Sequence, residues 1–238
     1  MGVEVAGPDR WPQRCDWRQS HTWLSALLHS GAALLPEVPT DPDHRGMHRI
    51  ATLLGAPSQR AVTPKAGLDE GRGVQSVRAL PTPVHDRFGS KLRSSSSAAF
   101  ALHTDEAFLE TPCRWVLLHC WRPDPAQQGA SLLADLCVLN SPELRSVSQR
   151  KFPYPCGPHA TCPSDAPWRF NRDLLAPDAL APEVQSAVAD LAATLTQHQV
   201  RFLLQPGELL LIDNWRIAHG REAFAPDSPR LLKRLRLL

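Results

Sequence analysis

The 238-residue sequence lacks a long apolar run, an excess of either charge and a basic, then apolar, opening segment. Its longest apolar stretches, such as 24–28 and 209–212, fall far short of the roughly 20 residues that cross a bilayer. The missing opening signal argues against secretion. Lys and Arg exceed Asp and Glu by only 26 − 24 = 2, which excludes the strong basic field typical of nucleic-acid-binding proteins. We therefore expect a cytoplasmic protein with neither a membrane nor a nucleic acid as its partner.

Cysteine is also sparse, with six residues in a chain long enough to bury a core without cross-links. Because no export signal is predicted, we expect free thiols. Cys156, His159 and Cys162 place three potential zinc ligands within seven residues. This segment has no CxxC pair and no obvious fourth ligand nearby, so an irregular loop is favoured over a zinc site.

The composition that remains, 42% hydrophobic and 21% charged, is typical of a folded globular protein. Helical spacing of apolar residues predicts helices over 16–35, 43–54, 142–150 and 182–198. Short apolar segments bounded by turn residues predict strands over 74–80, 100–104, 115–121, 131–136, 200–204, 209–212 and 230–237. This order favours an α+β, mainly β protein built on an antiparallel sandwich or barrel with flanking helices.

No internal repeat is visible, and we expect one domain over 1–238. Residues 1–15 are predicted to be an irregular lead-in. Residues 57–100 are rich in Pro, Gly and Ser and are predicted to form loops and edge strands around an opening. The segment 152–168 contains five prolines and is predicted to be a lid-like loop.

Three residues from two distant segments form a candidate metal site. His103 and Asp105 are two positions apart at a strand end, so their side chains project to the same face. His219 follows the predicted strand 209–212. Two imidazoles and one carboxylate form the facial triad of non-haem Fe(II), which leaves coordination positions open for other ligands.

Open positions on Fe(II) imply a co-substrate, and 2-oxoglutarate would chelate the metal through its 2-oxo and C1 carboxylate groups. Its far carboxylate then needs a cationic partner, for which a planar guanidinium is well suited. Arg230 lies 11 residues after His219, and Arg234 and Arg236 follow with even spacing on one face of the last strand. Since a sandwich interior does not accept Arg without a counter-anion, an inward face predicts an anionic ligand.

The sequence resembles the taurine dioxygenase and clavaminate synthase-like Fe(II)/2-oxoglutarate-dependent oxygenases. The matching stretches are 103–112 (HTDEAFLETP), 129–131 (GAS), 207–224 (GELLLIDNWRIAHGREAF), and Arg230 with Arg234. The resemblance implies a double-stranded β-helix, or jelly roll, in which His103, Asp105 and His219 bind iron. It further implies that Arg230 holds the far carboxylate of 2-oxoglutarate, with Ser131 as its hydroxyl partner. Arg234 is similar to a second family arginine that faces the co-substrate or substrate.

The activity implied by the resemblance is oxidation of a small amino-acid-like molecule in specialised metabolism of the antibiotic type. With Fe(II), 2-oxoglutarate and O2, such an enzyme hydroxylates an unactivated C–H bond and releases succinate and CO2; desaturation, ring closure or epimerisation are alternative outcomes. Asp105 argues against the halogenating relatives, which carry a small residue at this position. The first hundred residues have no convincing match, so they leave the substrate undetermined, and the oligomeric state is equally undetermined.

Two other functional classes remain open at this point. A metal-dependent hydrolase can use the same three ligands, but it needs a general base near the metal and has no use for a buried Arg230. A non-catalytic jelly-roll binding protein with a vestigial metal site is the second alternative.

His119 is expected to be a core histidine, and Arg216 and Arg221 are expected to be surface residues flanking a turn. The sequence Gln127-Gln128-Gly129 replaces the glycine pair usual in the family, which leaves the turn before Ser131 to be examined.

Overall fold

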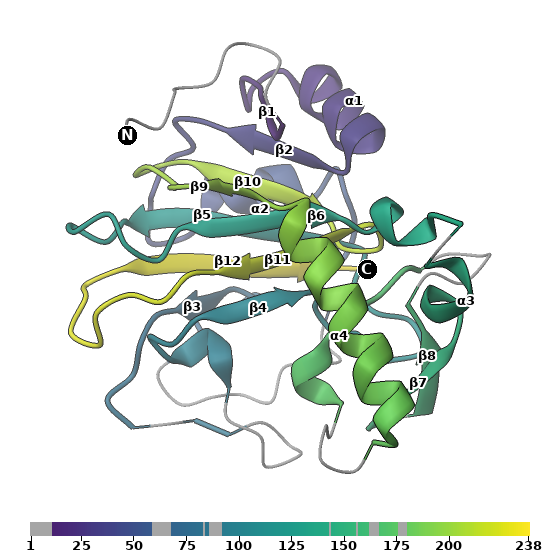
Figure 1. The fold of residues 1–238 in the computed structure, drawn as a ribbon. Helices are drawn as coiled ribbons and strands as arrows, with labels where there is room; N and C mark the ends of the chain where they lie inside the picture. The colour runs from purple at the N-terminus through teal and green to yellow at the C-terminus, as the bar shows by residue number, and fades with distance from the viewer. Residues whose placement is uncertain are drawn as a thin grey trace, which may run out of the picture.

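The computed structural model describes residues 11–58, 68–82, 84–85, 92–142, 144–155, 157–161, 167–175 and 180–238. Two mainly antiparallel sheets stack at its centre, and helices cover their outer faces (Figure 1). The larger sheet contains, in spatial order, β1 (Gln13–Arg14), β2 (Ala32–Leu35), β10 (Leu209–Asp213), β5 (Trp115–Arg122), β12 (Leu231–Leu237) and β3 (Gln75–Val77). The smaller sheet contains β4 (Phe100–His103), β11 (Ile217–Arg221), β6 (Ser131–Asp135) and β9 (Val200–Phe202). These sheets form the mainly β sandwich that the sequence predicts.

The outer face of the larger sheet is covered by α1 (Ser20–Ser30) and α2 (Arg45–Ala51). Trp23 of α1 and Met47 of α2 are fully buried in one apolar cluster with the outward-facing residues of β10 and β12. Burial of side chains of this size contributes about 2 kcal/mol each, so this cluster anchors both helices.

The outer face of the smaller sheet is covered by α4 (Pro182–Gln197), which crosses it in Figure 1. Leu191 and Leu195 form its buried stripe and pack in one cluster with Ala218 of β11. Among the described residues, the remaining helical segments are α3 (Arg145–Ser148) and three 3₁₀ turns at Arg93–Ser95, Leu136–Asn140 and Arg172–Leu174.

The last strand, β12, shows how the interior between the sheets acquires charge. Leu235 and Leu237 face outward into the cluster with α1 and α2, whereas Leu232 packs between the sheets. Because side chains alternate along a strand, Arg234 and Arg236 point into the same interior as Leu232. The face that Arg234 and Arg236 share is therefore the inward one, the case in which the sequence implies an anionic ligand.

The predicted helix over 16–35 is wrong in its second half. α1 ends at Ser30 because Gly31 adopts a left-handed conformation, with φ of +77°, and donates to the carbonyl of Leu27. Residues 32–35 then form β2, buried between β1 and β10. Helical spacing favoured Leu34 as a helix residue, whereas pairing with β10 places it in the sheet.

Other boundaries also differ from prediction. The expected irregular lead-in contains β1, which pairs in parallel with β2; residues 1–10 lie outside the described part. The expected loop 152–168 contains a hairpin of β7 (Lys151–Tyr154) and β8 (Gly157–Ala160), whose Phe152 is buried. β11 was not predicted as a strand, because polar and aromatic residues flank its short apolar part.

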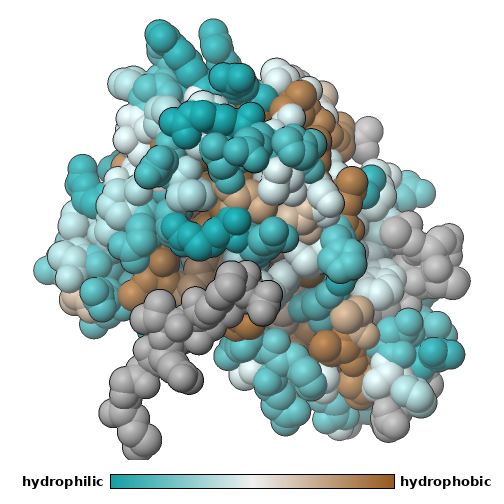
Figure 2. Space-filling model, turned by 90° about the horizontal axis from the view of Figure 1, so that it is seen from above, coloured by the Kyte–Doolittle hydropathy of each residue, from teal (hydrophilic) through white to brown (hydrophobic). Residues whose placement is uncertain are grey.

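The surface seen in Figure 2 is mainly hydrophilic, as expected for a folded globular protein of this composition. No helix in the described ranges is long and apolar enough to span a membrane. On the face seen from above, near α1, hydrophilic side chains predominate and apolar ones appear in separate patches (Figure 2).

Candidate metal centre

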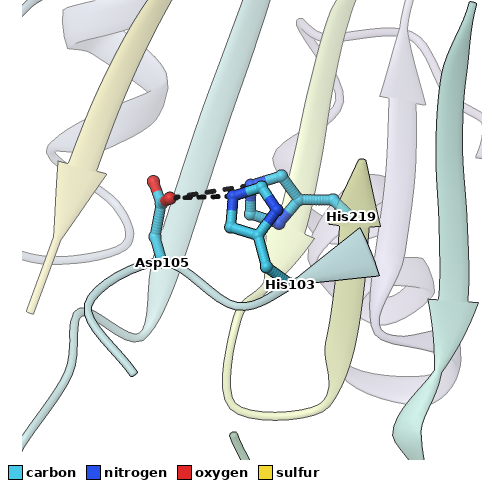
Figure 3. A group of neighbouring side chains, drawn as sticks. All are labelled: His103, Asp105 and His219. Carbon is cyan, nitrogen blue, oxygen red and sulfur yellow. Dashed lines mark ion pairs between the residues drawn. The ribbon is translucent and has the colours of Figure 1, made fainter. Parts of the chain in front are cut away.

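Two adjacent strands of the smaller sheet bring the predicted triad together. His219 on β11 lies opposite His103 at the end of β4, and their ring centroids are 4.5 Å apart. Asp105 follows β4 by two residues, and its Oδ1 lies 3.4 Å from Nε2 of His103 and 3.8 Å from Nε2 of His219 (Figure 3). All three side chains are buried, and one ligand atom from each lies within 4.8 Å of the others.

The histidine rings are oriented by their surroundings. Nδ1 of His103 lies 2.9 Å from the carbonyl oxygen of Ala101, and the ring stacks on Phe100 at 3.8 Å between centroids. A bond from Nδ1–H to this carbonyl leaves Nε2, which is buried without a hydrogen-bond partner, as the ligand atom. For His219 the nitrogen nearest Asp105 is also Nε2, at 3.8 Å from Oδ1, while its Nδ1 is buried without a hydrogen-bond partner. Two imidazole nitrogens that converge on one carboxylate oxygen fit a divalent metal.

Asp105 stays ionised in this buried position. Burial alone raises its pKa, but Arg234, the contact with His103 and the charge of Arg236 outweigh burial and hold the pKa well below its usual range. Nη1 of Arg234 lies 3.1 Å from Oδ2 and Nε of Arg236 lies 3.8 Å from the same oxygen, while Oδ1 faces the histidines. Nη1 of Arg234 also lies 3.4 Å from Oδ1, so the arginines contact mainly Oδ2, while Oδ1 is the oxygen nearest the two histidines.

We expect the metal-free protein to lose stability as the pH falls below neutrality. Burial lowers the pKa of His219 to about 3 and that of His119 to about 4, so both rings are neutral in the folded protein. The unfolded chain binds a proton at each near pH 6.5, so folding becomes less favourable below that pH, by about 2 kcal/mol per group at pH 5. Urea unfolding at pH 7 and pH 5 measures the loss, and His119→Gln should reduce it by about 2 kcal/mol. An identical loss in this variant would contradict the assignment.

A small pocket, with a cavity volume of about 40 Å³, lies between the two sheets beside the triad. His103 and His219 line it together with Arg230, Ser131 and Arg234, so all the predicted site residues except Asp105 contribute to its wall. The described residues that line this pocket include three guanidinium groups and no carboxylate. Such a wall fits an anionic ligand.

Arg230 is the guanidinium best placed for that anion. It is only 4% exposed, its Nη1 is buried without a hydrogen-bond partner, and none of the described carboxylates forms an ion pair with it. Burial lowers its pKa to about 10, which still leaves it charged at neutral pH. Phe224 packs against the guanidinium at 5.3 Å, and Gly129 makes room for it, since a Cβ there would lie 3.0 Å from Nε of Arg230. The turn before Ser131 is therefore kept despite the two glutamines, because Gln127 and Gly129 both adopt positive φ.

Arg221 is a pocket residue that the sequence analysis assigned to the surface. It is 6% exposed, and its Nη2 donates to the carbonyls of Ser96 (2.7 Å) and Ala98 (2.6 Å). Burial and the charge of Arg230 lower its pKa to about 9. Its position two residues after His219 on the same strand face was the signal that could have placed it inside.

The other sequence assignments have mixed outcomes. Arg216 pairs with Asp135 through Nη2 at 2.6 Å near the surface, as expected. His119 is a buried core histidine whose Nε2 lies 3.1 Å from the carbonyl of Val38. The four described cysteines are free: Cys15, Cys113, Cys120 and Cys137. Cys156 and Cys162 lie outside the described residues, so the zinc alternative is not addressed.

Asn214 supports the candidate metal centre and was not predicted from the sequence. Its side chain accepts from the backbone N–H of Asp105 (2.7 Å) and donates to the Asp105 carbonyl (2.9 Å), which fixes the ligand's backbone. Arg236 was predicted to face inward, but its contact with Glu106 (Nη1 to Oε1, 3.4 Å) was not foreseen. Neither residue has a spacing that reveals such a partner in advance.

We expect Gly220→Ala to weaken metal binding about tenfold, the loss typical of disturbing a ligand's support. A Cβ at Gly220 would lie 2.8 Å from the carbonyl oxygen of Phe100 and 3.1 Å from the backbone N of Leu102, so β4 must move and carry His103 with it. Gly71→Ala is the control, because a Cβ there meets nothing within 4 Å although the φ is positive. Calorimetric Fe(II) titration of both variants under argon measures the effect; equal affinities would show that β4 tolerates the shift.

The fold and this cluster define a class: a jelly-roll protein with a candidate two-histidine, one-carboxylate metal centre between its sheets. Residues 9–137 and 155–236 match the family described as "Taurine catabolism dioxygenase TauD, TfdA family". The chain belongs to this family.

Curated relatives carry names of amino-acid oxidising enzymes. L-asparagine oxygenase of Streptomyces coelicolor is 29% identical over 181 residues, which cover 68% of this chain and 53% of the relative. Clavaminate synthase 2 of Streptomyces clavuligerus is 27% identical over 232 residues (81% and 65%), and L-lysine 3-hydroxylase of Catenulispora acidiphila is 28% identical over 242 residues (89% and 64%). The chain thus spans 53% to 65% of the length of these relatives.

Solved structures share the fold. Asparagine oxygenase superposes with a TM-score of 0.69 at 23% identity, covering 93% of this chain and 78% of that one. The non-haem iron oxygenase OrfP, solved with Fe and alpha-ketoglutaric acid, gives 0.63 at 17% identity, with coverages of 91% and 77%. These likenesses confirm the predicted double-stranded β-helix.

Proposed function

We propose that this protein is an Fe(II)- and 2-oxoglutarate-dependent oxygenase. The observation that carries the proposal is a pocket lined by both histidines of a buried His-Asp-His cluster and by an arginine without an anion partner. His103, Asp105 and His219 would hold the metal, and Arg230 with Ser131 would hold the far carboxylate of 2-oxoglutarate. The bound metal and co-substrate supply the oxidising chemistry. The protein's own residues bind, orient and neutralise these groups.

The charges in the pocket support this pairing. Asp105 supplies one negative charge at the candidate metal position, and Arg234 and Arg236 already balance it. Arg230 has no such balance, so an anion that reaches it gains a charge-assisted, two-pronged hydrogen bond in a buried setting. Arg234, which lines the same pocket, would add a second positive charge near a bound anion.

The hydrolase alternative has less support. A hydrolase needs a general base that faces the metal-bound water, but the described pocket lining has no carboxylate, and Asp105 beside it is itself a candidate ligand. The adjacent carboxylate of Glu106 is occupied by Ser58, Arg236 and the N–H of Cys113. The geometry therefore favours the oxygenase.

For the substrate we propose a free amino acid or a small molecule derived from one, with hydroxylation as the reaction. The support is the set of relatives, which are named for asparagine, lysine and clavaminate chemistry. Antibiotic-type specialised metabolism is the setting that clavaminate synthase 2 suggests.

A substrate screen tests this proposal. The protein is supplied with Fe(II), 2-oxoglutarate and O2, and succinate is measured with each common amino acid in turn. We expect one amino acid or a small group of them to stimulate succinate release at least about tenfold over the background. No succinate with any amino acid, although 2-oxoglutarate binds the Fe(II) protein, would remove the amino-acid assignment; no 2-oxoglutarate binding at all would remove the oxygenase itself.

A further inference from the structure

The turn that follows the candidate ligands depends on a side chain from a distant segment. Residues 105–111 leave β4 in a turn whose carbonyls include those of Ala107, Leu109 and Glu110. Nη1 of Arg169 donates to the carbonyls of Ala107 (3.3 Å) and Leu109, and Nη2 donates to that of Glu110 (3.1 Å). One planar guanidinium thus satisfies three acceptors that helix or sheet bonding would otherwise have to satisfy.

The guanidinium of Arg169 carries a buried positive charge that needs polar partners. The residue is 4% exposed, and no ion pair with it is formed by any carboxylate in the described ranges. Burial lowers its pKa from the usual arginine value, which shows that the cation is removed from water. The converging carbonyl dipoles are its main compensation, so the turn and the guanidinium hold each other in place.

The segment that carries Arg169 also binds the backbone between the ligands. The N–H of Thr104 donates to the carbonyl of Phe170 (2.6 Å), and the N–H of Phe170 donates to Oγ1 of Thr104 (3.1 Å). Thr104 lies between His103 and Asp105. Segment 168–171 therefore supports the ligand pair through the backbone of Thr104. Asn214, in the β10–β11 connection, supports the backbone of Asp105.

We propose that Arg169 is a positioning residue for the metal centre: it fixes the turn that aims Asp105 and so sets the affinity for the metal. The inference rests on the proposed metal site, and it goes beyond it by assigning control of that site to the insertion between β6 and β9. Arg169 acts through the backbone of 104–110 and touches neither metal nor co-substrate.

Metal binding in matched variants tests this inference, with Co(II) as the probe because its visible spectrum reports the ligand set. Arg169→Lys keeps the charge but loses the planar fork, and Arg169→Gln loses both. We expect both to bind Co(II) at least about tenfold more weakly and to show an altered spectrum, the loss typical of removing a ligand's support. Arg172→Gln is the control. This neighbouring arginine is half-exposed, and its ion pair among the described residues is with Asp173, at 3.8 Å between Nε and Oδ1. It should bind Co(II) like the parent protein.

Two further readouts separate positioning from general stability. At saturating metal, 2-oxoglutarate affinity should stay within about twofold of the parent value, since Arg230 is untouched. Folded Arg169→Lys protein with parental Co(II) affinity and spectrum would overturn the inference while leaving the proposed function intact. A parent protein that binds no Co(II) would instead overturn both.

Hydrogen exchange of the unaltered protein provides a test that no variant's folding can obscure. Co(II) should slow exchange at the amides of Thr104, Asp105 and Leu109 and also at those of Arg169 and Phe170, because the two segments share hydrogen bonds. Protection confined to 103–110, with none in 168–171, would show that the two segments are not coupled.

Discussion

Asp105→Asn is expected to abolish metal binding, with Fe(II) affinity reduced by more than about 100-fold and no measurable turnover. The carboxylate is the one anionic member of the candidate ligand set; a neutral amide does not offset the metal's charge, and its carbonyl oxygen is a weaker donor than a carboxylate oxygen. The change also leaves Arg234 and Arg236 without their shared counter-charge, which should lower the free energy of unfolding by about 3 kcal/mol. Anaerobic calorimetric titration and urea unfolding measure the two effects.

Two comparison variants separate these effects. His219→Ala removes a ligand while both arginines stay paired with Asp105, so it should lose the metal without exposing a buried charge. Asp135→Asn removes a carboxylate that pairs with Arg216 near the surface, and it should bind Fe(II) normally. Undiminished Fe(II) binding by Asp105→Asn would refute its role as a ligand.

Arg230→Gln is expected to raise the 2-oxoglutarate concentration needed for half-saturation about 100-fold. Two charge-assisted hydrogen bonds to a buried carboxylate contribute together about 3 kcal/mol, and each 1.4 kcal/mol is a factor of ten. Fe(II) binding without co-substrate should be unchanged, because Arg230 makes no contact with Asp105 among the interactions of the described residues. Anaerobic titration of the Fe(II) protein with 2-oxoglutarate measures this directly.

Two further variants separate the contribution of the charge of Arg230 from that of its planar shape. Arg230→Lys keeps the charge without the fork, and we expect an intermediate increase of about tenfold. Arg201→Gln removes an exposed arginine that pairs with Glu222 on the surface, and it should leave the titration unchanged. If Arg230→Gln and Arg201→Gln titrate alike, another group holds the co-substrate.

The triad could be predicted from the sequence because strand geometry acts over short distances. The two-residue period of a strand predicted that His103 and Asp105 lie together, although β4 ends at His103 and Asp105 follows in a turn, and His219 falls on a segment with a strong family pattern. The inward face of β12 follows from the same period. The fold class followed from many short apolar segments bounded by turn residues.

What escaped prediction depends on contacts between distant segments. Gly31 ends α1 through its left-handed φ, but helical spacing continued past it, and only pairing with β10 shows that Leu34 belongs to a strand. Arg169 and Asn214 support the ligand turn from segments 60 and more residues away, and no local pattern marks either of them. Polar side chains that bind backbone carbonyls leave no periodic signal, so tertiary structure is needed to find them.

Diffraction from Fe(II)-soaked crystals at the iron absorption edge shows whether the three residues bind one metal ion. We expect a single strong anomalous peak between the sheets, about 2.0 to 2.3 Å from one nitrogen each of His103 and His219 and from an oxygen of Asp105. A peak elsewhere on the protein, or one that contacts the two histidines without Asp105, would contradict it.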